Sequence, residues 1–497
     1  MLKLVQNVPL FAIVGAMACA FLCAVLPRRA AKGLTLALTV LELAAAVWLT
    51  WFLAEYGDSY LYRMGHFPAP WGNELRAGVL EALMSACFSA VMLLSILGGQ
   101  HKVSQQVRAG KQNLYCVMLC LTQAALNALI YTNDLFTAYV FVEILTIAAC
   151  ALIMARQNGR TLVSAMRYMV LSLLGSGLIL ISISLLYDLT GQLLMEPMHQ
   201  ALQKLVASGQ YTLPITVVIG LSFVGLAIKS ALWPFHTWLP DAYGYATPTS
   251  SAVLSSLISK GYLFLLIKLF TRVIGMDVIA QSHATHLLLG FGVAAILMGS
   301  LSAIRAHDLR RMIAFSSVAQ IGYIYAGLGL GTQLGIVAAL FHMIAHSAGK
   351  SLLFLSASGL SDASGDSKHY ADLRGAGYRN PVAGAAFTVG SLTMVGVPLL
   401  GGFISKLLLA QAALDAGGVK LWILLSALII STVLNAVYFL RTVITLYRPA
   451  ERRCGPAPAQ PAAQKAALIT LSACNVALGV LATPLLQLLW QGLLMFD

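Results

Sequence analysis

Eight ionisable side chains lie within apolar stretches of this sequence, where a charge is costly. They are Lys229, Lys260, Lys268, Lys350, Lys406, Glu143, His342 and His346. An ionisable group at the centre of a bilayer costs from about 3 to over 10 kcal/mol, so such groups usually mark an ion or proton path. Ammonium, imidazole and carboxyl groups all exchange protons. Their number in one chain therefore predicts proton transfer through the interior of a membrane protein.

Spacing groups three of these residues on one surface. His342, His346 and Lys350 are four residues apart, so they share one face of a helix. Ser256 lies one turn before Lys260, and other small residues surround both sets. These patterns favour hydrated stripes, in which hydroxyl groups and water relay protons between groups that do not touch.

Two lysines adjoin predicted helix breaks. Pro234 and Pro240 follow Lys229, whereas Pro398, Gly401 and Gly402 precede Lys406. A helix interrupted within the membrane frees backbone carbonyls that protein or water must satisfy. Freed carbonyls and half-helix dipoles change the stability of the charged form of a nearby ammonium group. A lysine at such a break can change protonation state when its carboxylate partner moves, as a proton pump requires.

Other polar residues leave alternatives open. Lys268 lies near the end of its apolar run, so we expect its side chain to extend to the membrane interface. Glu42 either makes a local polar contact or contributes to function. His236 and Asp241 lie in the irregular segment after Lys229, and His236 is either structural or functional.

Composition places the whole chain in a membrane. The 497 residues are 59% hydrophobic and only 10% charged, against about 25% charged in soluble domains. The formal net charge of +13 is explained by membrane topology and requires no nucleic acid. The eight cysteines form no C-x-x-C pair. No nucleotide-binding, haem or zinc motif is visible, so we expect no metal, no cofactor and no redox site in the chain itself.

The fold class that we predict is an all-α membrane protein with about fourteen spans, because one span needs about 20 apolar residues. The expected spans are 8–26, 33–53, 79–99, 113–131, 134–154, 164–187, 213–232, 249–271, 284–304, 312–330, 333–357, 383–411, 421–446 and 467–492. Spans 7 and 12 carry the two breaks and are expected to be discontinuous. The first span lacks a basic leader and is not expected to be a signal peptide.

Basic residues set the expected orientation. Twenty lysines and arginines lie in the loops on one side of these spans and six on the other. Cytoplasmic loops carry the excess of basic residues. We therefore expect a multi-pass protein of the cell membrane with both termini outside the cytoplasm.

The paired breaks also suggest a division of the chain. Interrupted helices at corresponding positions are typical of inverted-repeat transporters. We expect N-terminal spans in 1–112, one five-helix repeat in 113–274, an inverted second repeat in 284–446, and a linker with a final span in 447–497.

Four segments carry a resemblance to a known family. The segments are SALWPFHTWLPDAYGYATPTSSAVLSSLISKGY, DLRRMIAFSSVAQIGYI, FHMIAHSAGKSLLFLSASG and GVPLLGGFISKLLL. Together they resemble the antiporter-like subunits of Mrp-type cation/proton antiporters, respiratory complex I and membrane-bound hydrogenases. The chain departs from the usual family pattern at Tyr243 and at Ser250–Ser251, and it shows no long C-terminal lateral helix.

The resemblance implies roles for particular residues. Glu143 looks like the glutamate of span 5, and Lys229 looks like its lysine partner in span 7. Lys260 and His346 resemble a central relay, with His342 and Lys350 beside it. Lys406 resembles the terminal residue of span 12, and a lysine there favours the Mrp D type or one class of complex I subunit.

The resemblance further implies partners in the form of other membrane subunits, with protons and, as a second candidate, sodium as the transported ions. The chain would then belong to a redox-driven complex or to an antiporter. Two alternatives stay open at this point: a self-sufficient carrier for another substrate, and a structural subunit that does not transport.

Overall fold

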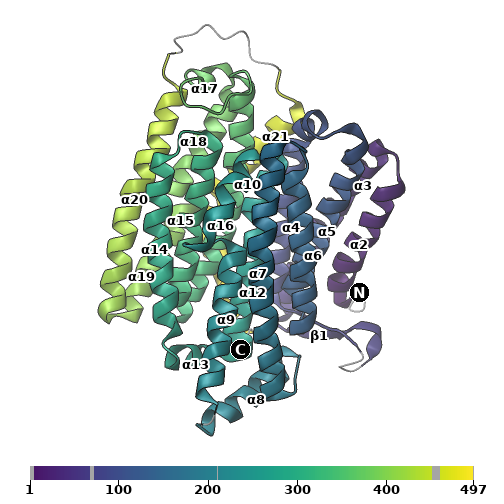
Figure 1. Ribbon diagram of the computed structural model, residues 1–497, viewed down its shortest axis with the longest axis vertical. Coiled ribbons are helices and arrows are strands. Elements are labelled where there is room, and N and C mark those ends of the chain that lie inside the picture. The colour runs from purple at the N-terminus through teal and green to yellow at the C-terminus, as the bar shows by residue number, and fades with distance from the viewer. Residues whose placement is uncertain (1–4, 68–71, 210, 450–458, 496–497) are drawn as a thin grey trace.

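The computed structural model describes residues 5–67, 72–209, 211–449 and 459–495. Part of the linker in the stretch 447–466, including Cys454, Arg452 and Arg453, lies outside these residues. The described chain folds into a bundle of helices whose axes run along the long dimension of the molecule (Figure 1). The predicted all-helical fold class is confirmed.

Thirteen helical segments of the described residues are long and apolar enough to cross a membrane. The first six are α2 (Val8–Val25), α3 (Arg28–Tyr56), α4 (Val79–Gln106), α5 (Gln112–Tyr131), α6 (Leu135–Met154) and α7 (Gly159–Thr190). The later unbroken ones are α14 (Ala284–Arg305), α15 (Leu309–Leu330), α16 (Gln333–Asp362), α20 (Gly418–Leu446) and α21 (Ala462–Val480). A further crossing is supplied jointly by α18 (Pro381–Val395) and α19 (Gly401–Ala416).

The two predicted breaks are present. Span 7 consists of α9 (Thr212–Ser230), the short η3 (Phe235–Trp238) and α10 (Leu239–Tyr245). Span 12 is divided between α18 and α19. The two broken helices cross the bundle in opposite directions, because α9 rises from the end that carries α8 (Met195–Ala207), whereas α18 starts near α17 (Ala376–Arg379) at the other end (Figure 1).

Two spans differ from the expectation of continuous helices. Span 8 is α11 (Pro248–Val253) and α12 (Ser259–Lys268) joined by a π-helical turn, η4 (Leu254–Ile258), and it ends in a second π-helical segment, η5 (Leu269–Ile274). The predicted single span 467–492 is wrong: α21 ends at Val480, and α22 (Ala482–Leu494) follows a break at Leu481. Pro484 in the first turn of α22 lacks the N–H that would continue α21.

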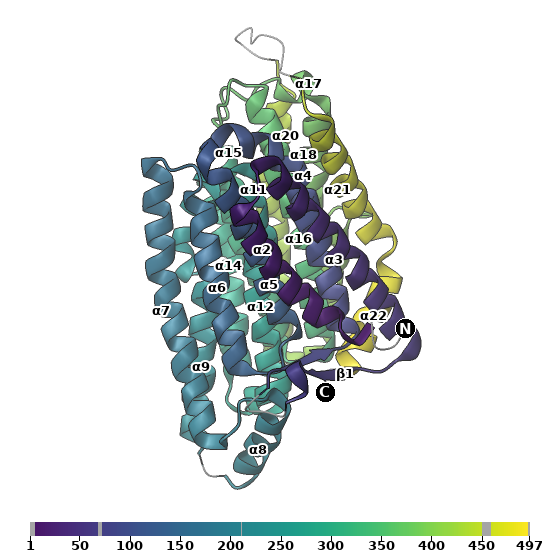
Figure 2. The same ribbon diagram turned by 90° about the vertical axis from the view of Figure 1, so that its right-hand side faces the viewer.

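The two ends of the bundle differ. A β-hairpin of β1 (Tyr60–Arg63) and β2 (Glu74–Ala77), paired from Tyr60↔Ala77, lies at the end that also carries α8 and both chain termini (Figures 1 and 2). Arg76 of this hairpin donates a hydrogen bond to the Met495 carbonyl. α17 and the basic loops lie at the opposite end, so the described chain crosses an even number of times.

The core is centred on α16, whose most apolar window is entirely buried. Small residues allow close helix contact with it, as between Gly327 of α15 and Gly335 of α16, where a Cβ added to either glycine would lie within 2.8 Å of the carbonyl oxygen of the other. The predicted site residues on α16, which are His342, His346 and Lys350, therefore lie at the centre of the molecule.

Candidate proton-transfer axis

Glu143 of α6 and Lys229 of α9 form an ion pair in the first half of the bundle. Lys229 Nζ lies 3.6 Å from Glu143 Oε1. The lysine side chain is fully buried, whereas 26% of the glutamate side chain is exposed. Ser176 of α7 donates a further hydrogen bond to Glu143 Oε1. The structure thus brings together the carboxylate and the lysine that the sequence paired.

A hydroxyl chain leads from this ion pair toward α12. Lys229 Nζ donates to Thr146 Oγ1 at 2.6 Å, and Thr146 Oγ1 lies 3.2 Å from the hydroxyl of Tyr262. The Lys229 ammonium also lies 5.7 Å from the centre of the Tyr262 ring. Tyr262 is two residues after Lys260 in α12, so these contacts reach the helix that carries the next buried lysine.

Lys260 is buried beside the π-helical turn η4. Its ammonium donates to the Ser255 carbonyl and, at 3.3 Å, to Ser259 Oγ. A π-helical turn leaves backbone carbonyls without their usual α-helical partners, and the Ser255 carbonyl serves here as a lysine acceptor. Ser256, which the sequence placed beside Lys260, contacts α16 instead through its carbonyl, which accepts from Ser347 Oγ at 2.7 Å.

Serines of α15 connect Lys260 with Lys350 of α16. Ser255 Oγ lies 3.1 Å from Ser317 Oγ. The neighbouring Ser316 accepts a hydrogen bond from Lys350 Nζ, which also donates to the Ile313 carbonyl at 2.9 Å. Both lysines are completely buried, and each is held by neutral oxygen atoms.

The two histidines of α16 continue the row toward α19. Their rings are stacked with centroids 5.8 Å apart, in agreement with the predicted common helix face. His342 Nδ1 lies 2.9 Å from Ser405 Oγ of α19. Neither ring nitrogen of His346 has a hydrogen-bond partner among the described residues, although buried polar groups almost always have one.

Lys406 ends the row at the break of span 12. Its ammonium donates to the Val395 carbonyl at 2.7 Å and to Thr432 Oγ1 at 3.2 Å. Val395 is the last residue of α18, so the lysine satisfies a carbonyl that the break frees and lies at the favourable, negative end of that half-helix. Tyr323 lies between this lysine and His342: its ring is 5.5 Å from the ammonium and 5.3 Å from the imidazole.

The break itself depends on close packing. Pro398 and the positive-φ residue Leu399 lie between α18 and α19. An added Cβ on Gly402 would lie 1.8 Å from the Thr393 carbonyl oxygen. Gly401 packs against α16, where an added Cβ would lie 3.3 Å from Ala345 Cβ. These glycines allow the two half-helices to overlap, which places Lys406 beside Val395.

The break of span 7 is fixed by an ionic contact at the basic end of the bundle. Asp241 of α10 pairs with Arg167 Nη1 at 2.9 Å and with Arg311 Nη2 at 3.1 Å. Pro234 and His236 lie in the preceding segment, where the His236 ring packs at 6.4 Å from Phe315. Asp241 therefore ties the segment to α7 and α15, and both readings of His236 stay open.

A loop lysine also contacts α10. Lys368 Nζ donates to the Gly244 carbonyl at 2.9 Å. Burial, followed by the nearby Arg310 guanidinium, lowers the pKa of Lys368 to about 7. This loop therefore adds a second attachment between α10 and the other half of the molecule.

Two of the remaining predicted groups lie away from this row. The expectation that Lys268 extends to the interface is wrong: it is fully buried and donates to the Leu129, Ile130 and Thr132 carbonyls at the end of α5, at 3.3, 2.8 and 2.5 Å. These carbonyls have no partner within α5, so the ammonium caps the helix. Glu42 accepts from Asn127 Nδ2 at 3.2 Å, which supports the local polar contact.

Several contacting residues were not predicted from the sequence. Thr146, Ser176, Tyr262, Tyr323 and Ser405 supply the hydroxyls and rings between the ionisable groups. Thr146 had a usable signal, because it lies three residues after Glu143 and so shares its helix face. Tyr323 and Ser405 carried no local signal, since only the packing of α15 and α19 against α16 brings them to His342.

The broken helices and the buried row of lysines, histidines and one glutamate define an antiporter-like, polytopic membrane protein. Residues 132–434 match the family of NADH:quinone oxidoreductase and Mrp antiporter transmembrane proteins. The chain belongs to this family.

Relatives and solved structures agree with this assignment. The chain is 35% identical over 440 residues to NADH-quinone oxidoreductase subunit N of Desulforudis audaxviator, covering 86% of this chain and 84% of that one. It is 28% identical to a chain of the membrane-bound sulfane sulfur reductase, an archaeal respiratory membrane complex, with a TM-score of 0.87 over 99% of this chain and 98% of that one. A chain of the Mrp complex from Dietzia sp. DQ12-45-1b, 23% identical, has the same fold, with a TM-score of 0.83 over 98% and 97% of the two chains.

Proposed function

We propose that this chain is a proton-translocating subunit of a larger membrane complex. The observation that carries the proposal is the row of ionisable groups from the Glu143–Lys229 pair to Lys406, in which all the groups between these ends are buried. A scaffold gains nothing from buried charges that cost several kcal/mol each. Proton transfer gives each of these groups a role.

The ion pair acts as the switch. With the two groups in contact, Glu143 stabilises the charged form of Lys229. Separating a fully buried pair leaves an uncompensated charge at a cost of about 3–5 kcal/mol, and the partial exposure of Glu143 reduces this figure. Separation therefore favours release of the lysine proton, and the Thr146 and Tyr262 hydroxyls lie in the direction of Lys260.

The second half of the axis receives this proton. Lys260 donates to the Ser255 carbonyl, the Ser255 hydroxyl contacts that of Ser317, and Lys350 donates to the hydroxyl of the adjacent Ser316. Water beside the unpartnered nitrogens of His346 would extend this relay to His342. From His342, Ser405 and Tyr323 lead to Lys406.

The chemistry of the axis favours protons as the transported ion. Buried ammonium groups repel a sodium ion, whereas they accept and release protons. We also propose that the basic end of the bundle faces the cytoplasm, which places both termini on the other side of the cell membrane. A flux assay with and without sodium separates proton transport from sodium/proton exchange.

The two ends of the axis are the most open parts of it. Glu143 is partly exposed, and Lys406 is partly exposed beside the outward-facing Leu399 and Leu407. The relatives named above are a subunit of a quinone oxidoreductase and chains of membrane complexes. We therefore propose that neighbouring membrane subunits adjoin this chain and that energy reaches it from them.

A double-mutant cycle tests the switch. Glu143→Ala and Lys229→Ala should each reduce proton transport by the assembled complex to below about a tenth of wild type, and the double variant should be little worse, because residues that act as one unit are non-additive. Glu143→Asp should retain part of the activity, because the charge is kept.

The control is Glu55→Ala. Glu55 is an exposed carboxylate near the C-terminal end of α3, next to Tyr56, which is 64% exposed. It should leave transport unchanged. Normal pumping by Glu143→Gln, or independent losses that multiply in the double variant, would show that Glu143 and Lys229 are not a coupled pair.

A further inference from the structure

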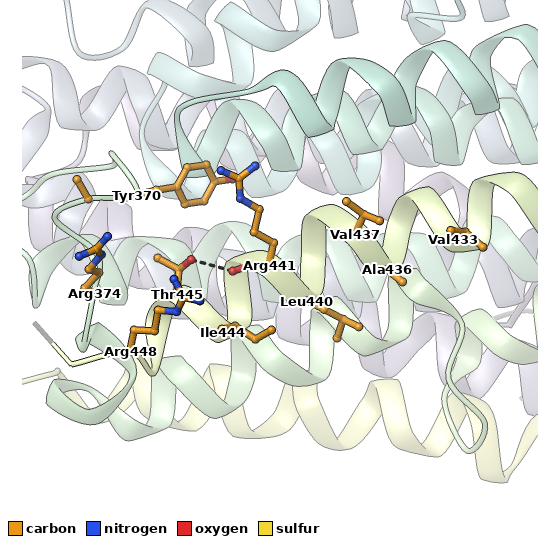
Figure 3. A pocket seen from close by; sticks show the side chains of 11 residues that line it. Tyr370, Arg374, Val433, Ala436, Val437, Leu440, Arg441, Ile444, Thr445 and Arg448 are labelled. Carbon is orange, nitrogen blue, oxygen red and sulfur yellow. Dashed lines mark hydrogen bonds between the residues drawn. The ribbon is translucent and has the colours of Figure 1, made fainter.

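A groove on the outer surface of the second half of the bundle has a distinct chemical character. It has a volume of about 770 Å³ and lies between α20 and the loop that follows α16 (Figure 3). Arg374, Arg441 and Arg448 line it, together with Tyr370 and the apolar side chains of α20. No acidic residue lines it among the described residues.

The arginines gather at one end of the groove. Figure 3 shows Arg374 and Arg448 near the loop, with the Arg441 guanidinium extending toward the Tyr370 ring. Arg441 and Arg448 are exposed, and no described carboxylate forms an ion pair with either. This end of the groove lies at the basic end of the bundle, where the C-terminal end of α20 lies near α17 (Figure 1).

The other end of the groove is apolar and faces outward. Val433 and Val437 are 59% and 46% exposed, and they lie on the face of α20 that also carries Arg441. At 1.5 Å per residue, the apolar face extends about 12 Å from Arg441 to Val433. That length is close to one leaflet of a hydrocarbon core about 30 Å thick.

We propose that this groove binds an anionic phospholipid. The guanidinium groups would hold the phosphate, because arginine forms forked hydrogen bonds with phosphate oxygens. The acyl chains would lie along the exposed apolar face of α20. An acidic protein segment would match the arginines but not the apolar extension toward mid-membrane, so charge and shape together favour the lipid. This proposal is independent of the proton axis.

The test uses the purified membrane assembly that contains the chain, delipidated in detergent and supplied with phosphatidylglycerol or phosphatidylcholine. Native mass spectrometry counts bound lipid, and thermal unfolding reports stabilisation. Wild type should bind phosphatidylglycerol in preference to phosphatidylcholine. The double variant Arg441→Gln/Arg448→Gln should bind it at least about tenfold more weakly, given about 1 kcal/mol for each arginine near an anionic lipid.

The matched control is Arg28→Gln/Arg29→Gln, which removes two exposed arginines from the same end of the bundle at the start of α3. It should keep wild-type lipid binding. Equal phosphatidylglycerol binding by both double variants would overturn the proposal. So would equal stabilisation by inorganic phosphate, or loss of a neighbouring subunit instead of lipid from the Arg441→Gln/Arg448→Gln assembly.

Discussion

At the residue scale, the Thr146 hydroxyl is the contact that connects the ion pair with the rest of the axis. It accepts from Lys229 at 2.6 Å and lies 3.2 Å from the Tyr262 hydroxyl. Thr146→Val keeps the size of the side chain and removes the hydroxyl. A hydrogen bond to a charged group contributes about 1.5–3 kcal/mol, so we expect roughly a tenfold or greater loss of proton transport.

The matched control for this variant is Thr122→Val. Thr122 is also a buried helical threonine, but its hydroxyl donates only to the Met118 carbonyl of its own helix at 2.7 Å. Its replacement should leave the transport rate in reconstituted vesicles close to wild type. Equal rates for the two variants would mean that Thr146 does not carry the proton from Lys229.

Substitutions of Lys406 can distinguish the effect of its positive charge from the effect of its proton exchange. Arginine can keep the contact with the Val395 carbonyl but is not deprotonated in proteins. Both Lys406→Ala and Lys406→Arg should therefore reduce transport by the assembled complex to below about a tenth. Lys406→Arg should assemble normally, as judged by subunit composition. Near-normal pumping by either assembled variant would remove Lys406 from the proton path.

The sequence predicted the ionisable groups better than their surroundings. A lysine in an apolar run is visible without a structure, and the contacts pair Glu143 with Lys229 and His342 with His346. The role of the seven residues in proton transfer stays a prediction. Their acceptors are neutral hydroxyls and carbonyls, such as Ser316 and Val395, which are common in any helix. Lys268 shows the limit of the approach: the sequence did not reveal that this buried lysine caps the end of α5.

At the element scale, the break between α18 and α19 sets the position of Lys406. Gly402→Ala would place a Cβ 1.8 Å from the Thr393 carbonyl oxygen, so α19 must move away from α18. Overpacking of this kind costs about 1–3 kcal/mol. We expect a lower thermal unfolding temperature and weaker transport, because the lysine loses its position beside Val395.

Gly290→Ala in α14 is the control for this variant, because nothing lies within 4 Å of its added Cβ. Alanine favours a helix over glycine, so thermal stability should be unchanged or higher. Equal unfolding temperatures and transport rates for Gly402→Ala and wild type would show that the half-helices need no close overlap.

Proline and glycine made both breaks predictable, since Pro234, Pro398 and Gly402 interrupt long apolar runs. The same logic applied to Pro484 would have found the break before α22, which the sequence interpretation joined to α21. The hairpin of β1 and β2 was not predicted, because each strand has only four residues. The division into two inverted repeats stays a prediction, supported by the opposite directions of the broken helices (Figure 1).

At the scale of the whole molecule, we expect the chain to need its neighbours. The axis has a partly exposed group at each end, Glu143 and Lys406, through which a neighbouring subunit can act on it. The described chain itself shows no source of energy for separating the Glu143–Lys229 pair. Purification from native membranes should therefore recover this chain together with other membrane subunits. The isolated chain, reconstituted in vesicles, should fold but should not drive proton transport. Circular dichroism and a cooperative thermal transition would establish that it is folded, so that inactivity reports missing partners and not damage. A folded monomer that transports at the rate of the complex would contradict the multisubunit proposal and favour a self-sufficient carrier.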